Sequence, residues 1–500
     1  MTVWCIRSSR DVALSALVCA LLVCQAFSPT AGAVEALSDE PTGMAAAVAL
    51  EETLSAAIAR SEKSVVSIAR VADKGAAPGD VQPDFLGRPR LGGLQGPNDP
   101  EFVPTSFATG VIVGKGLVLT NHHALVLDEK SRFYVITPSR KVYTAEVKAA
   151  APYSDLAVLE VKDPRDGDDF PPITFGDGSR LRKGQIVIAL GNPYAIARDG
   201  QASASWGIVA NLQRKAAPVA GENGMPGRPT LQHLGALVQT DAKLNLGTSG
   251  GALLNLKGEM VGLTTSLAAV AGYEQAAGYS IPVDEAFLET VNKLKEGEER
   301  THGLLGITFH RDEELASPGV RVDTIFSAGP ARQADIVAHD IITRVNDQPI
   351  RDGDDLMLAI GRLPAGSRAR ITLQRRGRVI ERQVSLAKFP VQGKTIVTKM
   401  PPSWRGLRVD YATALAEYQL RVNSGEAPLE PCVIAREVAE ESPAWEAGLR
   451  RGMLVSHVGN VRVETPDEFA HAVAEKTGDV VLRLAGGPGK GESVTVRADR

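Results

Sequence analysis

Short apolar stretches separated by turn residues follow one another through the first half of the chain. Runs of this kind, bounded by Gly, Pro, Asn or Asp, are typical of β-strands, and many of them at even spacing favour an antiparallel barrel or sandwich. We therefore expect residues 65–292 to be all-β. The predicted strands are 64–71, 110–113, 117–120, 133–137, 142–149, 157–161, 185–190, 206–212, 235–239, 252–254 and 260–264.

A different pattern precedes the first strand. Small helix formers fill residues 42–60, with Leu50, Leu54 and Ile58 at helical spacing, which predicts an N-terminal helix. Residues 74–104 are rich in Gly, Pro and Asp without periodicity, and we interpret them as a long surface loop.

The first 33 residues have the pattern of a secretory signal. Arg7 and Arg10 are followed by an apolar run, Val12–Ala26, and by the small-residue site Ala31–Ala33. The run is shorter than the about 20 apolar residues that a spanning helix needs. We predict a cleaved signal peptide and an exported protein, periplasmic or extracytoplasmic. An uncleaved anchor and lipidation of Cys24 are the alternatives.

The C-terminal part contains an internal repeat. The segment 327–336 and the later segment 442–449 each start a short helix with Ser, Pro and Ala, and each lies between an apolar strand and a second strand. A polar turn, a further helix and a last strand follow in both copies, so we predict two α+β modules. The pattern resembles paired PDZ domains at 303–388 and 406–498.

Composition narrows the function. A chain with 44% hydrophobic and 23% charged residues is an ordinary globular protein, and 49 glycines and 30 prolines favour loop-rich β structure. A net charge of −4 gives nucleic acid no basic patch. Four cysteines exclude a disulfide-stapled scaffold, and Cys432, the only one after position 24, is expected to be a buried strand residue.

The strongest chemical signal is the turn Gly247–Gly251, which places Ser249 between glycines. Such a turn lets the amides of Gly247 and Ser249 converge on a developing oxyanion. A serine nucleophile also needs a base and an acid that orients the base. His122 and His123 follow one predicted strand, and Asp155 precedes another.

Each of these features has a simpler interpretation. The glycines can be an ordinary turn, the aspartate a turn residue, and the two histidines a solvated loop or a weak metal site. Adjacent histidines cannot easily face one metal, and no spaced His or Cys accompanies them. Together, in an all-β frame and in the order His, Asp, Ser, they predict a chymotrypsin-like protease in which two barrels meet at the site.

Several motifs resemble those of the HtrA/DegP family of trypsin-like serine proteases with C-terminal PDZ domains. The resemblance covers nearly everything after the signal. The matching stretches are Thr120–His123 (T-N-x-H), Ser154–Ala157, Leu190–Pro193, Gly207–Val209, Gln239–Ala242 and Gly278–Pro282.

The resemblance assigns roles to the candidate residues. The T-N-x-H register makes His123, rather than His122, the base, with Asp155 as its orienting acid and Ser249 as the nucleophile. Amides of Gly247, Thr248 and Ser249 are the oxyanion-hole candidates. The family also implies an endopeptidase that acts on misfolded or mislocalised proteins, PDZ modules that bind substrate or C-terminal peptides, and a homo-oligomer built from trimers.

Two positions depart from the family. Thr248 stands where an asparagine is usual before the nucleophile, and Lys243 replaces a small or apolar residue. If Lys243 points into the substrate pocket, acidic P1 residues are favoured. If it points outward, Leu244 floors a pocket for small aliphatic residues. The other predicted pocket residues are Leu263, Thr264 and Thr265.

The segment Leu304–Ile307 resembles a PDZ carboxylate-binding loop, because Gly306 permits close approach of a peptide. The second copy, at 405–408, matches less well. Either module could instead be structural or an oligomer contact.

The sequence thus predicts a mainly β protein, a chymotrypsin-like double β-barrel followed by two α+β PDZ domains. Its predicted parts are 1–33 (signal), 34–64 (helical segment), 65–292 (protease), 300–390 (first PDZ), 391–404 (linker) and 405–500 (second PDZ). We predict no cofactor and no metal. Residues 74–104 and 267–277 are expected to be regulatory loops. The rival functions are a proteolytically weak chaperone or peptide-binding scaffold and an esterase or acyltransferase.

Overall fold

The computed structural model describes residues 43–72, 104–125, 131–164, 170–192, 200–216, 230–265, 278–310, 318–415, 418, 430–485 and 491–498. The chain divides into two compact units, Met1–Glu52 and Thr53–Arg500. The predicted signal and both predicted regulatory loops lie outside the described residues, except for Pro104. No helix in the described part of the chain is long and apolar enough to cross a membrane.

Helix α1 (Gly43–Ser61) confirms the predicted N-terminal helix, and its alanine-rich sequence explains why it forms. In the second unit, Leu54 and Ile58 pack against the largest hydrophobic core. The hydroxyl of Ser61 donates to Gly258 O (2.6 Å), and the short turn η1 (Glu62–Ser64) then leads into the first strand.

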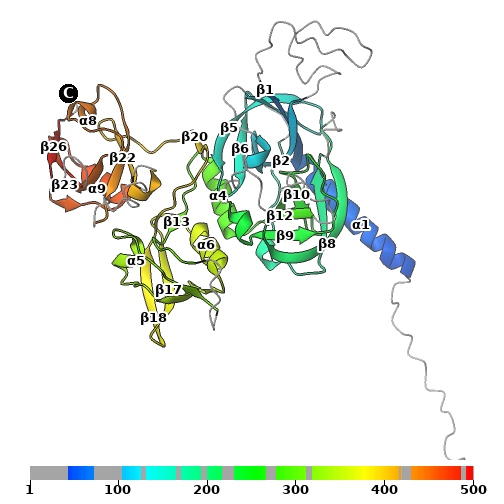
Figure 1. The fold of residues 1–500 in the computed structure, drawn as a ribbon. Coiled ribbons are helices and arrows are strands. Elements are labelled where there is room, and N and C mark those ends of the chain that lie inside the picture. Colours follow the sequence, from blue (N-terminus) through cyan, green and yellow to red (C-terminus); the bar gives the residue numbers. More distant parts are fainter. Residues whose placement is uncertain are drawn as a thin grey trace, which may run out of the picture. The chain divides into compact units, whose positions relative to one another are not determined.

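The first barrel is a closed ring of six strands (Figure 1). Its strands are β1 (Val65–Ala72), β2 (Ser106–Gly114), β3 (Leu117–Asn121), β4 (Ser131–Ile136), β5 (Val142–Ala151) and β6 (Leu156–Val161). The ring runs β5-β4-β1-β2-β3-β6 and closes where β6 pairs with β5. The one-turn helix α2 (His122–Leu125) follows β3 directly.

The second barrel, drawn mostly in green in Figure 1, is also closed, in the order β10-β11-β12-β9-β8-β7. The short turns η2 (Gly178–Arg180) and η5 (Leu231–Leu234) belong to its connections. The strands of this second barrel are β7 (Ile186–Gly191), β8 (Ser203–Arg214), β9 (Leu237–Thr240), β10 (Ala252–Leu254), β11 (Met260–Thr265) and β12 (Gly278–Pro282). Every predicted strand has a counterpart in one of the barrels, whereas β12 was not among the predicted strands.

The expectation that residues 65–292 are all-β is wrong at the end of the segment, where helix α4 (Glu285–Lys295) begins. Asp284 caps this helix, because its Oδ1 accepts a hydrogen bond from Phe287 N (2.9 Å). Phe287, Val291 and Leu294 recur at helical spacing and are buried in the core. A pattern of short apolar runs does not by itself reveal this helical spacing.

Two α+β modules follow, and each has its own hydrophobic core. The first contains β13 (Gly303–Leu304), β14 (Val320–Arg321), α5 (Pro330–Gln333), β15 (Ile341–Val345), β16 (Gln348–Pro349), α6 (Gly353–Arg362), β17 (Arg368–Arg375), β18 (Arg378–Ser385) and β19 (Ala387–Lys388). The second, after β20 (Ile396–Val397), contains β21 (Leu407–Tyr411), η6 (Ala412–Ala414), β22 (Val433–Val438), α8 (Pro443–Glu446), β23 (Leu454–Val458), β24 (Val461–Arg462), α9 (Pro466–Val473), β25 (Val480–Leu484) and β26 (Ser493–Val496).

The modules share one order of elements. From β14 to β18 and from β22 to β26, both run strand, short helix, strand, short strand, helix and a final pair of strands. Both short helices have Pro at their first turn, which suits a residue without a backbone N–H. Cys432 is buried, as expected, and is not in a disulfide, but it immediately precedes β22 and does not lie in a strand.

Candidate active site

His123 and Asp155 are brought together by the pairing of β3 with β6 in the first barrel. The register places Asn121, the last residue of β3, opposite Leu156, the first residue of β6. The residues just outside this pair, on α2 and on the turn before β6, must therefore be neighbours. His122 donates its backbone N–H to Asp155 O (3.1 Å), and His123 follows it.

Asp155 presents its carboxylate to His123 from a tight turn. Its backbone has φ +56°, in the left-handed region that aspartate tolerates better than most residues. Asp155 Oδ1 accepts from the backbone N–H of His123 (2.9 Å), and Oδ2 lies 2.8 Å from His123 Nδ1. Asn121 Nδ2 adds longer bonds to Asp155 O and Oδ2 (3.3 Å each).

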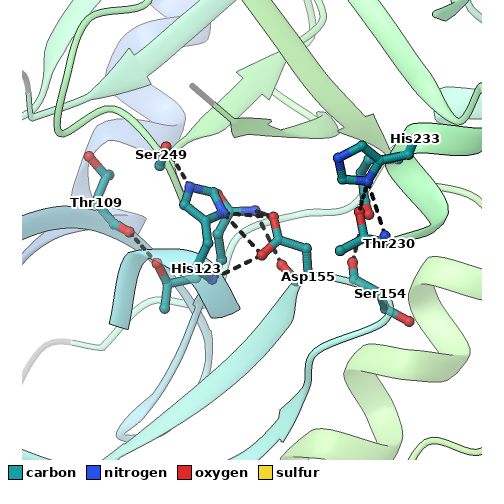
Figure 2. A network of polar contacts seen from close by, with 10 residues as sticks. Thr109, His123, Ser154, Asp155, Thr230, His233 and Ser249 are labelled. Atoms are coloured by element: carbon teal, nitrogen blue, oxygen red, sulfur yellow. Dashed lines mark hydrogen bonds and ion pairs between the residues drawn. The ribbon is translucent and has the colours of Figure 1, made fainter. Parts of the chain in front are cut away.

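Ser249 reaches the same place from the second barrel, at the turn before β10. Its Oγ lies 3.3 Å from His123 Nε2, and Figure 2 shows the imidazole between the hydroxyl and the carboxylate. The Asp155 side chain is 3% exposed and that of His123 is 25% exposed. The carboxylate is thus shielded, while the imidazole keeps one side open to an incoming group.

The electrostatics of His123 are dominated by two opposing effects. Burial lowers its pKa, because it penalises the charged form, but the charge of Asp155 and the hydrogen bond to it raise the pKa more. The pKa of His123 therefore lies above its ordinary value of 6.5. The site stabilises an imidazolium.

Two glycines in the turn before β10 have backbone conformations that other residues rarely adopt. Gly247 has φ +94° and Gly250 has φ +86°. A Cβ at Gly250 would lie 2.1 Å from Thr109 O, and one at Gly247 would lie 2.6 Å from the Phe107 ring, so neither position has room for a side chain. The sequence signal of paired glycines therefore has a steric cause.

Amide donors of this turn differ in their partners. Thr248 N–H donates to Asn245 O (3.1 Å), inside the turn itself. Gly247 N–H donates to no other described residue.

The chain is similar to two known domain families and to several known proteins. Residues 108–263 match the family described as "Trypsin-like peptidase domain", and residues 303–386 match the one described as "PDZ domain". A protein of Chlamydia trachomatis serovar D named "Probable periplasmic serine endoprotease DegP-like" is 28% identical over 386 residues, 75% of this chain and 71% of that protein. The "Periplasmic pH-dependent serine endoprotease DegQ" of Escherichia coli K12 is 28% identical over 404 residues, 78% of this chain and 80% of that one.

The chain is an HtrA-like serine protease with a PDZ domain. The solved structure "HtrA-type protease AlgW with decapeptide" is 23% identical to this chain, with a TM-score of 0.47. The match covers 70% of this chain and 99% of the AlgW chain.

The predicted pocket residues of this HtrA-like protease differ in how deeply they are buried. Lys243 is exposed, whereas Leu244 is buried in the core of the second barrel, where a Cβ at Gly278 would lie 2.6 Å from its Cδ1. Leu263 is fully buried in the main hydrophobic core, and Thr264 and Thr265 follow it on β11, also buried.

The predicted peptide-binding loop of the protease's PDZ domain has a distinctive backbone. Gly306 has φ +78°. The carbonyls of Leu305 and Gly306 accept from Ala331 N (3.0 Å) and Phe326 N (3.0 Å), but the amides of Leu305, Gly306 and Ile307 donate to no other described residue. Leu305 is buried in the module's core, whereas Leu304 and Ile307 are half-buried.

Two residues that touch the site, Asn121 and Thr109, have no role among the sequence-based predictions. Asn121 lies within the T-N-x-H motif, but its bonds to Asp155 were not foreseen. Thr109 was overlooked entirely, although its backbone N–H donates to Ser249 O (2.9 Å) and it lies beside Ser249 in Figure 2. A buried threonine inside a strand carries no local signal of such a contact.

Proposed function

We propose that His123, Asp155 and Ser249 form the catalytic triad of this protease. The observation that carries the proposal is the continuous line of contacts Asp155–His123–Ser249. A carboxylate can only accept, so Nδ1 of His123 carries the proton that faces Asp155. Nε2 then presents its lone pair to the hydroxyl of Ser249 and can take its proton as Oγ attacks a peptide carbonyl.

The raised pKa of His123 supports the same assignment. Asp155 stabilises the imidazolium formed during attack, and the imidazolium then gives its proton to the leaving amine. The acyl group left on Ser249 is removed by water, which His123 activates in turn. The reaction is therefore hydrolysis of a peptide bond with no cofactor.

Amides of Gly247 and Ser249 are the proposed oxyanion hole. The N–H of Gly247, which donates to no other described residue, is available to an oxyanion, as the role requires. The N–H of Thr248 is engaged with Asn245 O, which argues against Thr248 as a direct donor.

Substrate selection by the pocket is proposed from the placement of Lys243 and Leu244. An exposed Lys243 supports the outward orientation, and a buried apolar Leu244 supports a preference for small aliphatic P1 residues over acidic ones. Profiling cleavage of a peptide library tests this, and a preference for Asp or Glu at P1 would contradict it.

The modules 300–390 and 405–500 are proposed as two PDZ domains that bind C-termini or extended peptides of substrates. The shared order of elements supports the assignment of the second module. The consecutive amides of Leu305, Gly306 and Ile307, which donate to no other residue in the described part of the chain, support carboxylate capture by the first.

The wider setting follows from the relatives' names and from the sequence. Relatives are named periplasmic, and residues 1–33 have a signal-like pattern. We propose an extracytoplasmic protease of misfolded or mislocalised proteins that assembles from trimers. Analytical ultracentrifugation of the exported protein tests the assembly.

One set of variants tests the triad. Ser249→Ala, His123→Ala and Asp155→Asn should abolish or strongly reduce digestion of unfolded casein, with His122→Ala as the matched control. Fluorophosphonate labelling of the wild type should require Ser249. Full activity of His123→Ala would refute the choice of base. Labelling without proteolysis would favour an esterase, and absence of both in the wild type would favour a scaffold.

A second pair of variants tests the peptide-binding loop. Gly306→Ala adds a Cβ 3.1 Å from Pro330 Cδ at φ +78°, whereas Gly377→Ala adds one at the same φ with no atom within 4 Å. Fluorescence anisotropy with a pool of decapeptides, carrying free or amidated C-termini, should show binding of the free form only. Gly306→Ala should weaken that binding and Gly377→Ala should not. Equal binding by both variants would contradict the assignment.

A further inference from the structure

The turn that carries Ser249 is held by hydrogen bonds to its own carbonyls. Gly247 O accepts from Thr109 Oγ1 (2.6 Å), Thr248 O accepts from Thr264 Oγ1 (2.6 Å), and Ser249 O accepts from Thr109 N (2.9 Å). Each carbonyl of this segment therefore has a donor in the protein. Both threonines are fully buried, so water does not compete for these bonds.

Peptide geometry turns these bonds into an orientation. In a trans peptide, the C=O of one residue and the N–H of the next point in opposite directions. Fixing Thr248 O toward Thr264 therefore aims the N–H of Ser249 to the other side. Fixing Gly247 O toward Thr109 keeps that carbonyl from rotating, a rotation that the glycine backbone would otherwise tolerate.

The direction of the Thr109 hydroxyl follows from its partners. Thr109 Oγ1 accepts from Asn192 N (2.8 Å), and Gly247 O can only accept. The single hydroxyl proton of Thr109 must therefore point to Gly247 O. Asn192 directly follows β7, the strand that pairs with β10, and its Nδ2 donates to Ser67 Oγ (2.5 Å) on β1.

Thr109 itself has little freedom to move. Its own carbonyl accepts from Thr120 Oγ1 (2.8 Å) on the neighbouring strand β3. Gly250 packs directly against the same carbonyl, since a Cβ there would lie 2.1 Å from it. Thr109 thus connects the first barrel, which carries His123, to the turn of the second barrel, which carries Ser249.

We propose that Thr109 and Thr264 are positioning residues that hold the turn 247–249 ready to bind the oxyanion. This inference rests on the proposed function, because it takes Ser249 as the nucleophile and the amides of Gly247 and Ser249 as the oxyanion hole. Neither threonine contacts the reacting atoms. Their effect is to keep the amides preoriented, so the tetrahedral intermediate gains stabilisation that the bound substrate does not.

Thr109→Val and Thr264→Val remove the hydroxyls and keep the β-branched shape, and Thr109→Ser restores the hydroxyl. Thr290→Val is the matched control, because its hydroxyl is also buried and donates to a carbonyl, Ala286 O (2.7 Å), in helix α4. The assays are kcat and KM for labelled unfolded casein, the rate of fluorophosphonate labelling, inhibition by a peptide boronic acid, and thermal unfolding.

We expect kcat and the labelling rate of both site variants to fall about 10- to 100-fold, less than the full loss of an oxyanion donor, while KM changes less than about twofold. Boronic acid affinity should fall with kcat. Thr109→Ser should stay within about threefold of the wild type, and Thr290→Val should lose stability without losing kcat.

A folded Thr109→Val variant with the same kcat as the wild type would overturn the proposal. An equal loss of kcat in Thr109→Ser and Thr109→Val would overturn it as well. If Thr109→Val does not fold, Thr264→Val and Thr109→Ser decide in the same way. Activity in Ser249→Ala would instead refute the proposed triad. An inactive Ser249→Ala beside a fully active Thr109→Val would refute only the positioning role.

Discussion

His302 should make the protein less stable in mild acid. The residue is 2% exposed, with its Nδ1 2.7 Å from Gly361 O and its Nε2 3.4 Å from Ser154 Oγ. The carbonyl can only accept, so Nδ1 carries the proton and Nε2 is the site that acid would protonate. Burial is the main cause that lowers the pKa of His302 to about 4, and the charge of Arg300 adds to it.

The sign and size of the effect follow from linkage. In the unfolded chain a histidine has a pKa of about 6.5, so acid protonates the unfolded state first. The stability that buried, neutral His302 preserves is fully present above the unfolded-state pKa and is lost as pH falls from about 6.5 toward 4. The pKa values of His302 in the unfolded and folded states together lower the free energy of unfolding by about 2 kcal/mol at about pH 5, compared with about pH 7.5.

The assay is urea unfolding at both pH values, followed by circular dichroism. His302→Gln keeps an amide donor but cannot titrate, so the drop in unfolding free energy between the two pH values should be about 2 kcal/mol smaller than in the wild type. His310→Gln is the control, because the His310 side chain is 76% exposed. An equal drop in the wild type and in His302→Gln would refute the reasoning.

Other predictions concern the triad base, the glycine turn and a buried ion pair. In a pH–rate profile, kcat/KM should fall as pH drops through an apparent pKa above 6.5, because His123 must be neutral to act as a base and the carboxylate beside it raises its pKa. A midpoint at or below 6.5 would contradict this. Gly250→Ala should abolish casein digestion, whereas Gly184→Ala, at φ +83° with no atom within 4 Å, should keep it. Asp410→Asn leaves buried Lys388, 2.8 Å away, with one carboxylate fewer, and should cost about 3–5 kcal/mol in urea unfolding. A cost near zero would show that the pair is solvated.

Local sequence patterns were sufficient for the barrels and for the triad candidates. Strand runs and turns need only neighbouring residues, and the glycines beside Ser249 mark a conformation that other residues avoid. Helix α4 was overlooked, although Phe287, Val291 and Leu294 have the spacing of a buried helical face. That signal was present in the sequence, but it was not separated from the surrounding strands.

The choice between His122 and His123 marks the limit of local reasoning. Both imidazoles follow the same strand, and only the resemblance to a known motif favoured His123. In the structure, the pairing of β3 with β6 brings Asp155 to Nδ1 of His123, and the meeting of the barrels brings Ser249 to its Nε2.

By itself, the sequence determined the order of most strands, the glycine turn and the residue types of the proposed triad, because these are visible in patterns within a few residues. The tertiary structure decided which hydroxyls support the turn. Thr109 lies 138 residues from Gly247, and Thr264, on β11, bonds to Thr248 in the turn before β10. The bond from Thr109 to Gly247 exists only once the two barrels have come together, and the bond from Thr264 to Thr248 exists only once the second barrel has folded, so no local pattern could have identified them.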